Sequence, residues 1–104
     1  MKGVMNNNYT IRTLSENYRK HKRFLKEKES GINVHSKEEL DNSNYIVKHT
    51  EMVVNSLRER DRFIIYNEII LGKQGDWYRD CLSPATYYRH RKGAYERFLR
   101  CLNE

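Results

Sequence analysis

The sequence has little proline, glycine and cysteine, and it has no long apolar run. One proline and five glycines among 104 residues leave few positions that interrupt a regular backbone. Two cysteines are too few for a disulfide framework or a four-ligand zinc site, so we expect Cys81 and Cys101 to be free, buried thiols. No stretch has the apolar length of a membrane span, and no signal-peptide core begins the sequence. These absences predict a cytoplasmic protein with no membrane partner.

The residue patterns of enzymes are also absent. The four histidines are scattered along the chain, and none has a nucleophile or a second metal ligand at a useful spacing. There is no glycine-rich phosphate loop, and a chain of this length builds only one small core. We therefore expect no catalytic activity, no metal and no cofactor.

Positive charge is abundant and evenly spread. The formal net charge is +6, and residues 1–52 and 53–104 each contain ten Lys or Arg and seven Asp or Glu, which gives +3 in each half. The excess is thus not confined to a basic tail. Such a charge favours a polyanionic partner, and nucleic acid is the usual one.

The N-terminal region, residues 1–35, is predicted to contain one basic helix from Tyr9 to about Ser30, ended by Gly31. Its apolar positions follow a heptad spacing. They are Ile11, Leu14, Tyr18, His21 and Leu25. Two interpretations remain open. The helix could pack in the core with its basic face in solvent, or Ile11, Leu14, Tyr18 and Leu25 could form a homodimer contact.

Residues 36–104 are predicted to form the remaining helices. Ser36 and Glu39 have the spacing of a capping box, while residues 42–44 (Asn-Ser-Asn) are expected to interrupt the helix that follows. Residues 63–71 are the most apolar segment and should form the central core helix, ended by Gly72. A brief helix, residues 77–81 with a cap at Asp76, is expected next. The fold class is therefore an all-α bundle of about five helices.

The last helix carries the strongest functional signal. Ser83 is a favourable N-cap and Pro84 suits the first helical position. One side of this helix can be buried, while the other has short polar and cationic residues in its first turns, as entry into a DNA major groove requires. A short helix, a turn and a capped basic helix form a helix-turn-helix, with residues 83–102 as its recognition helix.

The segment from Leu57 to Leu102 resembles region four of bacterial sigma factors and, more closely, the ArpU-type regulators of phage late transcription. The resemblance rests on a Leu-x-x-Arg lead-in at Leu57, an aromatic anchor at Trp77, and the string Ser-x-x-Thr-Tyr-Tyr-Arg from Ser83 to Arg89 with Ala94 downstream. One departure concerns Asp80 and Cys81, where such proteins usually have leucine and glycine. We therefore expect a turn that is tighter or differently built.

The resemblance implies a transcriptional regulator that binds double-stranded DNA. It assigns the core position to Tyr87 and implies a set of base-facing residues. These are Ser83, Ala85, Thr86, Tyr88, Arg89 and Lys92. Lys73, Arg79 and Arg91 are expected to neutralise phosphates. Arg89 could instead contact phosphate or pair with Glu96, and the mid-helix Gly93 is expected to permit close helix packing.

Two alternative functions stay open. The first is a sigma-like interaction module that docks on RNA polymerase, with residues 58–62 as partner surface. The second is a phage DNA-packaging subunit, which would also use a helix-turn-helix. The target sequence, the direction of regulation and the oligomeric state do not follow from the sequence.

Overall fold

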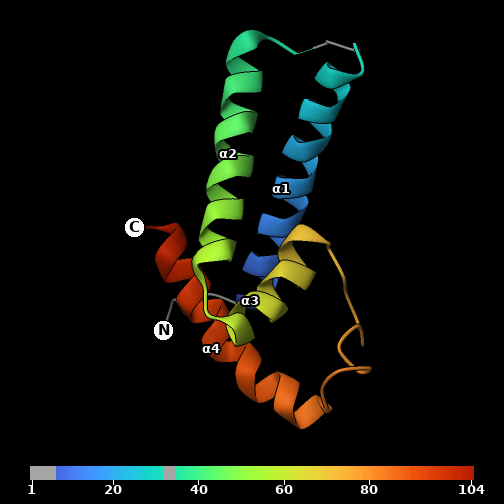
Figure 1. The fold of residues 1–104 in the computed structure, drawn as a ribbon, viewed down its shortest axis with the longest axis vertical. Coiled ribbons are helices and arrows are strands. Elements are labelled where there is room, and N and C mark those ends of the chain that lie inside the picture. Colours follow the sequence, from blue (N-terminus) through green and yellow to red (C-terminus); the bar gives the residue numbers. More distant parts are fainter. Residues whose placement is uncertain (1–6, 32–34) are drawn as a thin grey trace.

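The computed structural model describes residues 7–31 and 35–104, and within these residues every regular element is helical. Helices α1 (Asn7–Glu29) and α2 (Lys37–Ser56) pack side by side as a long antiparallel hairpin (Figure 1). At the base of the hairpin lie α3 (Glu59–Ile65), the π-helical turn η1 (Tyr66–Ile70) and α4 (Pro84–Leu102). The predicted all-α class is confirmed. The other residues of the predicted N-terminal region, 1–6 and 32–34, lie outside the described residues.

The helix ends form where local chemistry predicts them. Gly31 follows α1 with φ +85°, and its N–H donates to the carbonyl of Lys28 at 3.1 Å. At the start of α2 the capping box is complete, because Glu39 N–H donates to Ser36 Oγ at 3.1 Å and Ser36 N–H donates to Glu39 Oε1 at 2.9 Å. These bonds satisfy backbone groups that a helix end otherwise leaves without partners.

The core lies where the hairpin meets the shorter helices. Ile64, Ile65 and Ile69 have no exposed surface, as expected for the apolar segment of residues 63–71. From α4, Ala94 and Phe98 are also fully buried. Gly72 follows η1 with φ +67°, and the Arg19 side chain lies where a Cβ on Gly72 would stand. The left-handed backbone favours glycine at this position, whereas the flexible Arg19 side chain could move away from a Cβ.

The α3 segment does not continue as a regular α-helix. At η1 the backbone widens, with Leu71 N–H bonded to the carbonyl of Tyr66 at 3.1 Å. Ser15 of α1 donates its hydroxyl to the carbonyl of Ile69 at 2.9 Å, so a neighbouring helix satisfies that carbonyl. The wider turn carries Asn67, Glu68 and Ile69 all into the interior. Such π-turns are rare and occur often at functional sites.

The heptad seam of α1 faces the interior of the same chain. Ile11 and Tyr18 are buried, and Leu14 and Leu25 pack against the core. The structure therefore does not support a homodimer through these residues, because α2 and η1 already cover them. The structure agrees with the other interpretation, in which α1 packs in the core and its basic outer face is exposed to solvent.

Two other expectations about elements differ from the structure. Helix α2 is continuous through residues 42–44, because Ser43 is fully buried and its hydroxyl lies 2.7 Å from Nδ1 of His21. Within the described residues there are four α-helices, and the segment predicted as a short helix, residues 77–81, forms consecutive turns. The burial of Ser43 in the folded chain therefore outweighs the low helix propensity of these three residues.

The turns of residues 75–81 are organised by packing. Gly75 has φ +68°, and the N–H groups of Arg79 and Cys81 bond to carbonyls three residues earlier. Tyr78 is the buried side chain of this segment and stacks on Tyr87 with ring centroids 3.8 Å apart. A buried Cys81 was expected, but this thiol is exposed because Tyr78 occupies the inward position, while Cys101 is half-buried.

Candidate nucleic-acid interface

Helix α4 begins at the residue that the sequence indicates. Ser83 has extended backbone angles, and its Oγ accepts from the N–H of Thr86 at 3.2 Å. The same hydroxyl donates to Thr86 Oγ1 at 2.9 Å, and Pro84 occupies the first turn. This cap fixes the start of α4, where Pro84 and Ala85 are exposed.

The outward face of α4 comprises exposed residues at helical spacing. They are Ala85, Tyr88, Arg89, Lys92, Glu96 and Arg100. Four of them belong to the predicted base-facing set, which the structure thus places on one surface, with Ser83 exposed at its end. Thr86 is only half-exposed and is engaged in the cap. Tyr87 is buried, as the resemblance implies, whereas Tyr88 is 52% exposed.

The three residues predicted to neutralise phosphates have different surroundings. Lys73 is exposed, with its Nζ 6.0 Å from the centre of the Trp77 ring. Arg79 is also exposed and pairs with Asp76 at 3.3 Å. Arg91 is half-buried, and its guanidinium lies over the rings of Tyr87, Tyr88 and Tyr95 at 4.7 to 5.6 Å. Arg91 thus faces the inner side of α4 rather than its outward face.

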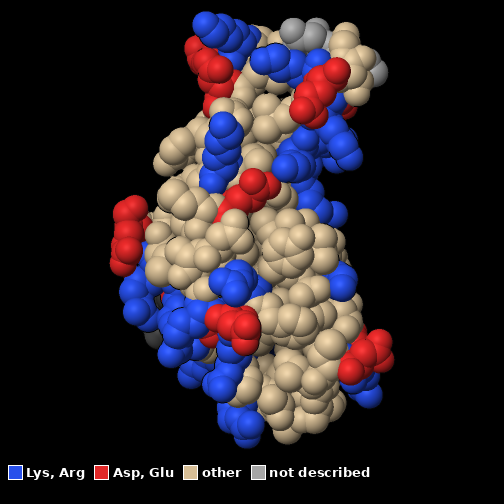
Figure 2. Space-filling model, viewed as in Figure 1, with Lys and Arg blue, Asp and Glu red and all other residues tan. Residues whose placement is uncertain are grey.

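A basic cluster adjoins the outward face, and sequence reasoning had not assigned it to DNA. Arg58 and Arg60, at the start of α3, are exposed, and both act electrostatically on Asp61. Desolvation and the positive charges of Arg60 and Arg89 lower the pKa of His90 below its ordinary value. Figure 2 shows Lys and Arg gathered over the region of α3 and α4, in the lower left.

A buried carboxylate ties α4 to the rest of the molecule. Glu68 of η1 accepts hydrogen bonds from the indole N–H of Trp77 at 2.9 Å and from the hydroxyls of Tyr87 and Tyr95. Burial and this carboxylate raise the pKa of Tyr87 to about 12, and the pKa of Tyr95 is raised by the same causes. We call Glu68, Trp77, Tyr87 and Tyr95 the Glu68 hub.

An ion pair anchors the middle of α4. Arg97 Nε and Nη2 donate to the two carboxylate oxygens of Asp61 at 2.5 and 2.9 Å, and Asp61 is buried. These hydrogen bonds outweigh the opposing effect of burial and hold the pKa of Asp61 below its ordinary value. A Cβ at Gly93 would lie 2.7 Å from Arg97 Nη2. Gly93 therefore makes room for the Arg97 side chain. The residue of α4 that permits close helix packing is its neighbour Ala94, which is fully buried.

Sequence reasoning missed both anchors of α4. Glu68 lies within the most apolar segment, and Asp61 within residues 58–62, which the sequence indicated only as a partner surface for RNA polymerase. A single carboxylate inside an apolar run is the signal that could have identified Glu68, because such a group is buried only with partners. Its three donors lie 9, 19 and 27 residues away in sequence.

Comparisons with protein-family models, with curated proteins and with solved structures found no match for this chain. None of the helices in residues 7–31 and 35–104 has both the length and the apolarity needed to cross a membrane. Those same residues contain no group of three or more His, Cys, Asp or Glu side chains arranged to hold a metal ion.

Proposed function

We propose that this protein is a transcriptional regulator that binds double-stranded DNA with the outward face of α4. The observation that carries the proposal is the exposed face of a capped helix with Ala85, Tyr88, Arg89 and Lys92 together. Arg is the side chain best suited to bidentate contact with guanine, and small side chains allow a helix to approach base edges. The resemblance to sigma region four and to ArpU-type regulators points to the same function.

The surrounding charge supports the proposal. Six exposed cations lie on the start of α3, on the first half of α4 and on the segment joining η1 to α4. They are Arg58, Arg60, Lys73, Arg79, Arg89 and Lys92. Contacts of such cations with phosphates supply most of the non-specific affinity of DNA-binding proteins. A helix-turn-helix requires a supporting helix before the recognition helix, and in this proposal α3 with η1 takes that role.

The proposal is tested with duplexes selected from a random pool by the full chain. Arg89→Ala should reduce affinity for the selected duplex by about 1–3 kcal/mol and remove the preference over unrelated DNA. Arg79→Ala, which removes a cation from the turn segment, should weaken binding to both duplexes equally. Fluorescence anisotropy with labelled duplexes measures both effects.

Arg23→Ala serves as a control because Arg23 is an exposed cation in the C-terminal half of α1, and that half of the helix lies away from α4 in Figure 1. Equal losses from the variants at positions 23, 79 and 89 would show that α4 is not the recognition helix. If duplex binding is absent and the chain co-purifies with RNA polymerase, the polymerase-docking alternative replaces the proposal. The exposed Arg58, Glu59 and Arg60 would then be the partner surface.

A further inference from the structure

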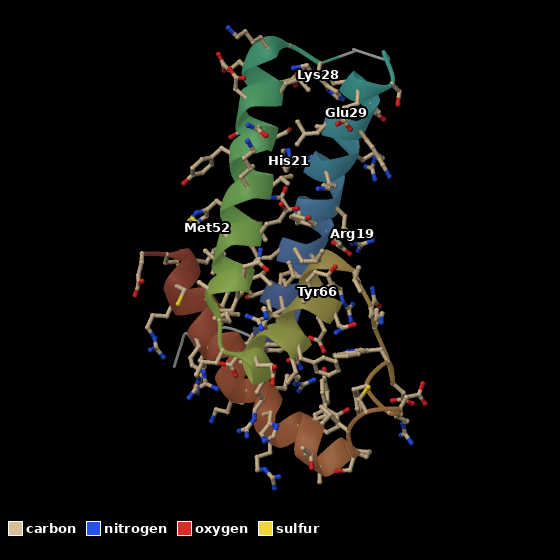
Figure 3. The ribbon with its side chains drawn as sticks, viewed as in Figure 1. Arg19, His21, Lys28, Glu29, Met52 and Tyr66 are labelled. Carbon is tan, nitrogen blue, oxygen red and sulfur yellow. The ribbon has the colours of Figure 1, made fainter. Side chains whose placement is uncertain are left out.

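An open pocket of about 250 Å³ lies on the inner side of α4, between the N-terminal half of α1 and the segment that follows η1. Residues from all three elements line it, including Arg12, Trp77 and Arg91. Tyr88 also borders it, so the pocket adjoins the outward face of α4 without being part of it. In Figure 3, Arg19 projects from α1 on the side where the chain leaves η1. Lys73 and Tyr88 belong both to this pocket and to the proposed DNA contacts, whereas Arg12, Arg19 and Arg91 line the pocket only.

The pocket has a strong positive charge. Four cations line it, Arg12, Arg19, Lys73 and Arg91, against one acidic residue, Glu68, which gives a net charge of +3. Within residues 7–31 and 35–104, none of these four cations is in an ion pair. Cations that line one pocket without ion-pair partners repel one another, and an anion would relieve that repulsion.

Three of the cations are held against the walls. Arg91 lies over three tyrosine rings, with the Tyr88 ring nearest at 4.7 Å, and Lys73 lies over Trp77. The Arg19 side chain fills the space beside Gly72, and its Nε donates to Ser15 Oγ at 3.3 Å. Because these side chains are already positioned, an anion would not have to order them on binding.

The other lining residues include four with aromatic side chains, and the buried Glu68 supplies a hydrogen-bond acceptor. Trp77, Tyr87, Tyr88 and Tyr95 contribute rings. Glu68 Oε1 accepts one hydrogen bond, from Tyr95, and a carboxylate oxygen has the capacity for a second. Tyr87 and Tyr95 are buried and have Arg91 over their rings, so Trp77 and Tyr88 are the rings with surface for stacking. The site thus combines two stacking surfaces, an acceptor for an N–H group and several cations suited to phosphate.

We propose that this pocket binds a nucleoside monophosphate, with the phosphate on the cations and the base against Trp77 and Tyr88. A phosphate monoester carries a charge of about −1.5 to −2 at pH 7, which suits a lining of net charge +3. A base with an N–H edge directed at Glu68 is favoured, so guanosine monophosphate is the first probe. This small-molecule site goes beyond the proposed DNA interface and does not depend on it.

Trp77 is the only tryptophan of the chain, so its fluorescence reports directly on the pocket. Titration of the full chain with guanosine monophosphate, excited at the red edge of the indole band, should give a saturable change. Inorganic phosphate and guanosine should each bind at least about tenfold more weakly than guanosine monophosphate, because each lacks half of the contacts. Calorimetry with the same three probes provides a second readout.

Arg12→Gln and Arg23→Gln form a matched pair, because both remove an exposed arginine of α1 and only Arg12 lines the pocket. Arg12→Gln should weaken the nucleotide about tenfold, whereas Arg23→Gln should leave it unchanged. Circular dichroism checks that both variants are folded. Equal weakening by the two variants would overturn the proposal, as would the lack of saturable binding by the unmodified chain up to about 5 mM nucleotide. A response to oligonucleotides alone would also overturn it, since the pocket would then belong to a nucleic-acid interface.

Discussion

At the scale of single residues, Glu68 is the group on which the placement of α4 most depends. It is one carboxylate with three donors, from the turn segment and from two positions of α4. Hydrogen bonds to charged groups contribute more than neutral ones, and a buried donor left without an acceptor is costly. The start of α4 and the turns before it are therefore held to η1 by the same side chain.

Replacing Glu68 by alanine should destabilise the fold by about 3 kcal/mol, because three buried donors lose their acceptor and a cavity remains. Urea unfolding followed by circular dichroism measures the change in the free energy of unfolding. Glu96→Ala is the matched control, since Glu96 is exposed on α4, and it should change that free energy by less than about 0.5 kcal/mol. Similar changes in the free energy of unfolding from both variants would mean that the Glu68 hub contributes little to the stability of the fold.

The ion pair between Asp61 and Arg97 should also contribute strongly to the stability of the fold. The lowered pKa of Asp61 means that its ionised form stabilises the fold. This stabilisation is present above the ordinary aspartate pKa of about 3.9 and is lost as the pH falls through the lower, folded-state value. Arg97 is 38% exposed, so the pair contributes less than a fully buried one.

Arg97→Ala should reduce the free energy of unfolding by about 2–3 kcal/mol at pH 7. The difference from the unmodified chain should shrink as the pH is lowered from 7 towards 3, because protonated Asp61 no longer needs the guanidinium. Denaturant titrations at several pH values measure this difference, with Arg100→Ala as an exposed control. A difference that is constant over this pH range would contradict the assigned role of Asp61.

At the scale of elements, the helices and their ends follow from local chemistry, whereas the connections between them do not. Ser36, Ser83, Gly31 and Gly72 mark boundaries because each satisfies helix-end groups or adopts a backbone angle that few residues allow. Heptad spacing identified the inward face of α1 but not what covers it, since the same apolar stripe suits α2 or a second copy. Within residues 63–71, apolar character predicted the buried isoleucines but not the exposure of Phe63, Tyr66 and Leu71, which are 36%, 42% and 48% exposed.

The segment from Gly72 to Ser83 could not be predicted because long-range contacts determine it. Asp76 and Trp77 have the local pattern of a short helix, yet Tyr78 is drawn onto Tyr87 and Trp77 onto Glu68. A helix of five residues has little stability of its own, so these contacts prevail. The π-turn that turns Glu68 inward likewise has no periodic signature in the sequence. Part of the candidate interface was predictable, namely the exposed face of α4, but not its anchors.

At the scale of the whole molecule, the two anchors act on α4 from its inner side. The Glu68 hub holds α4 through Tyr87 and Tyr95, and Asp61 holds it through Arg97, so its outward face takes no part in the core. The α1–α2 hairpin extends away from this end of the molecule. Exposed cations are present on α3, on α4 and on the segment between η1 and α4. This arrangement is the physical basis for the proposed DNA interface.

The salt dependence of duplex binding tests this account most directly. Binding of the full chain to a labelled duplex should weaken steeply as salt rises, with a slope of log K against log salt of about −5 if five or six phosphates are neutralised. Fluorescence anisotropy at several salt concentrations gives the slope. A slope near zero, or no duplex binding at low salt, would contradict the proposal that this basic end of the molecule binds DNA.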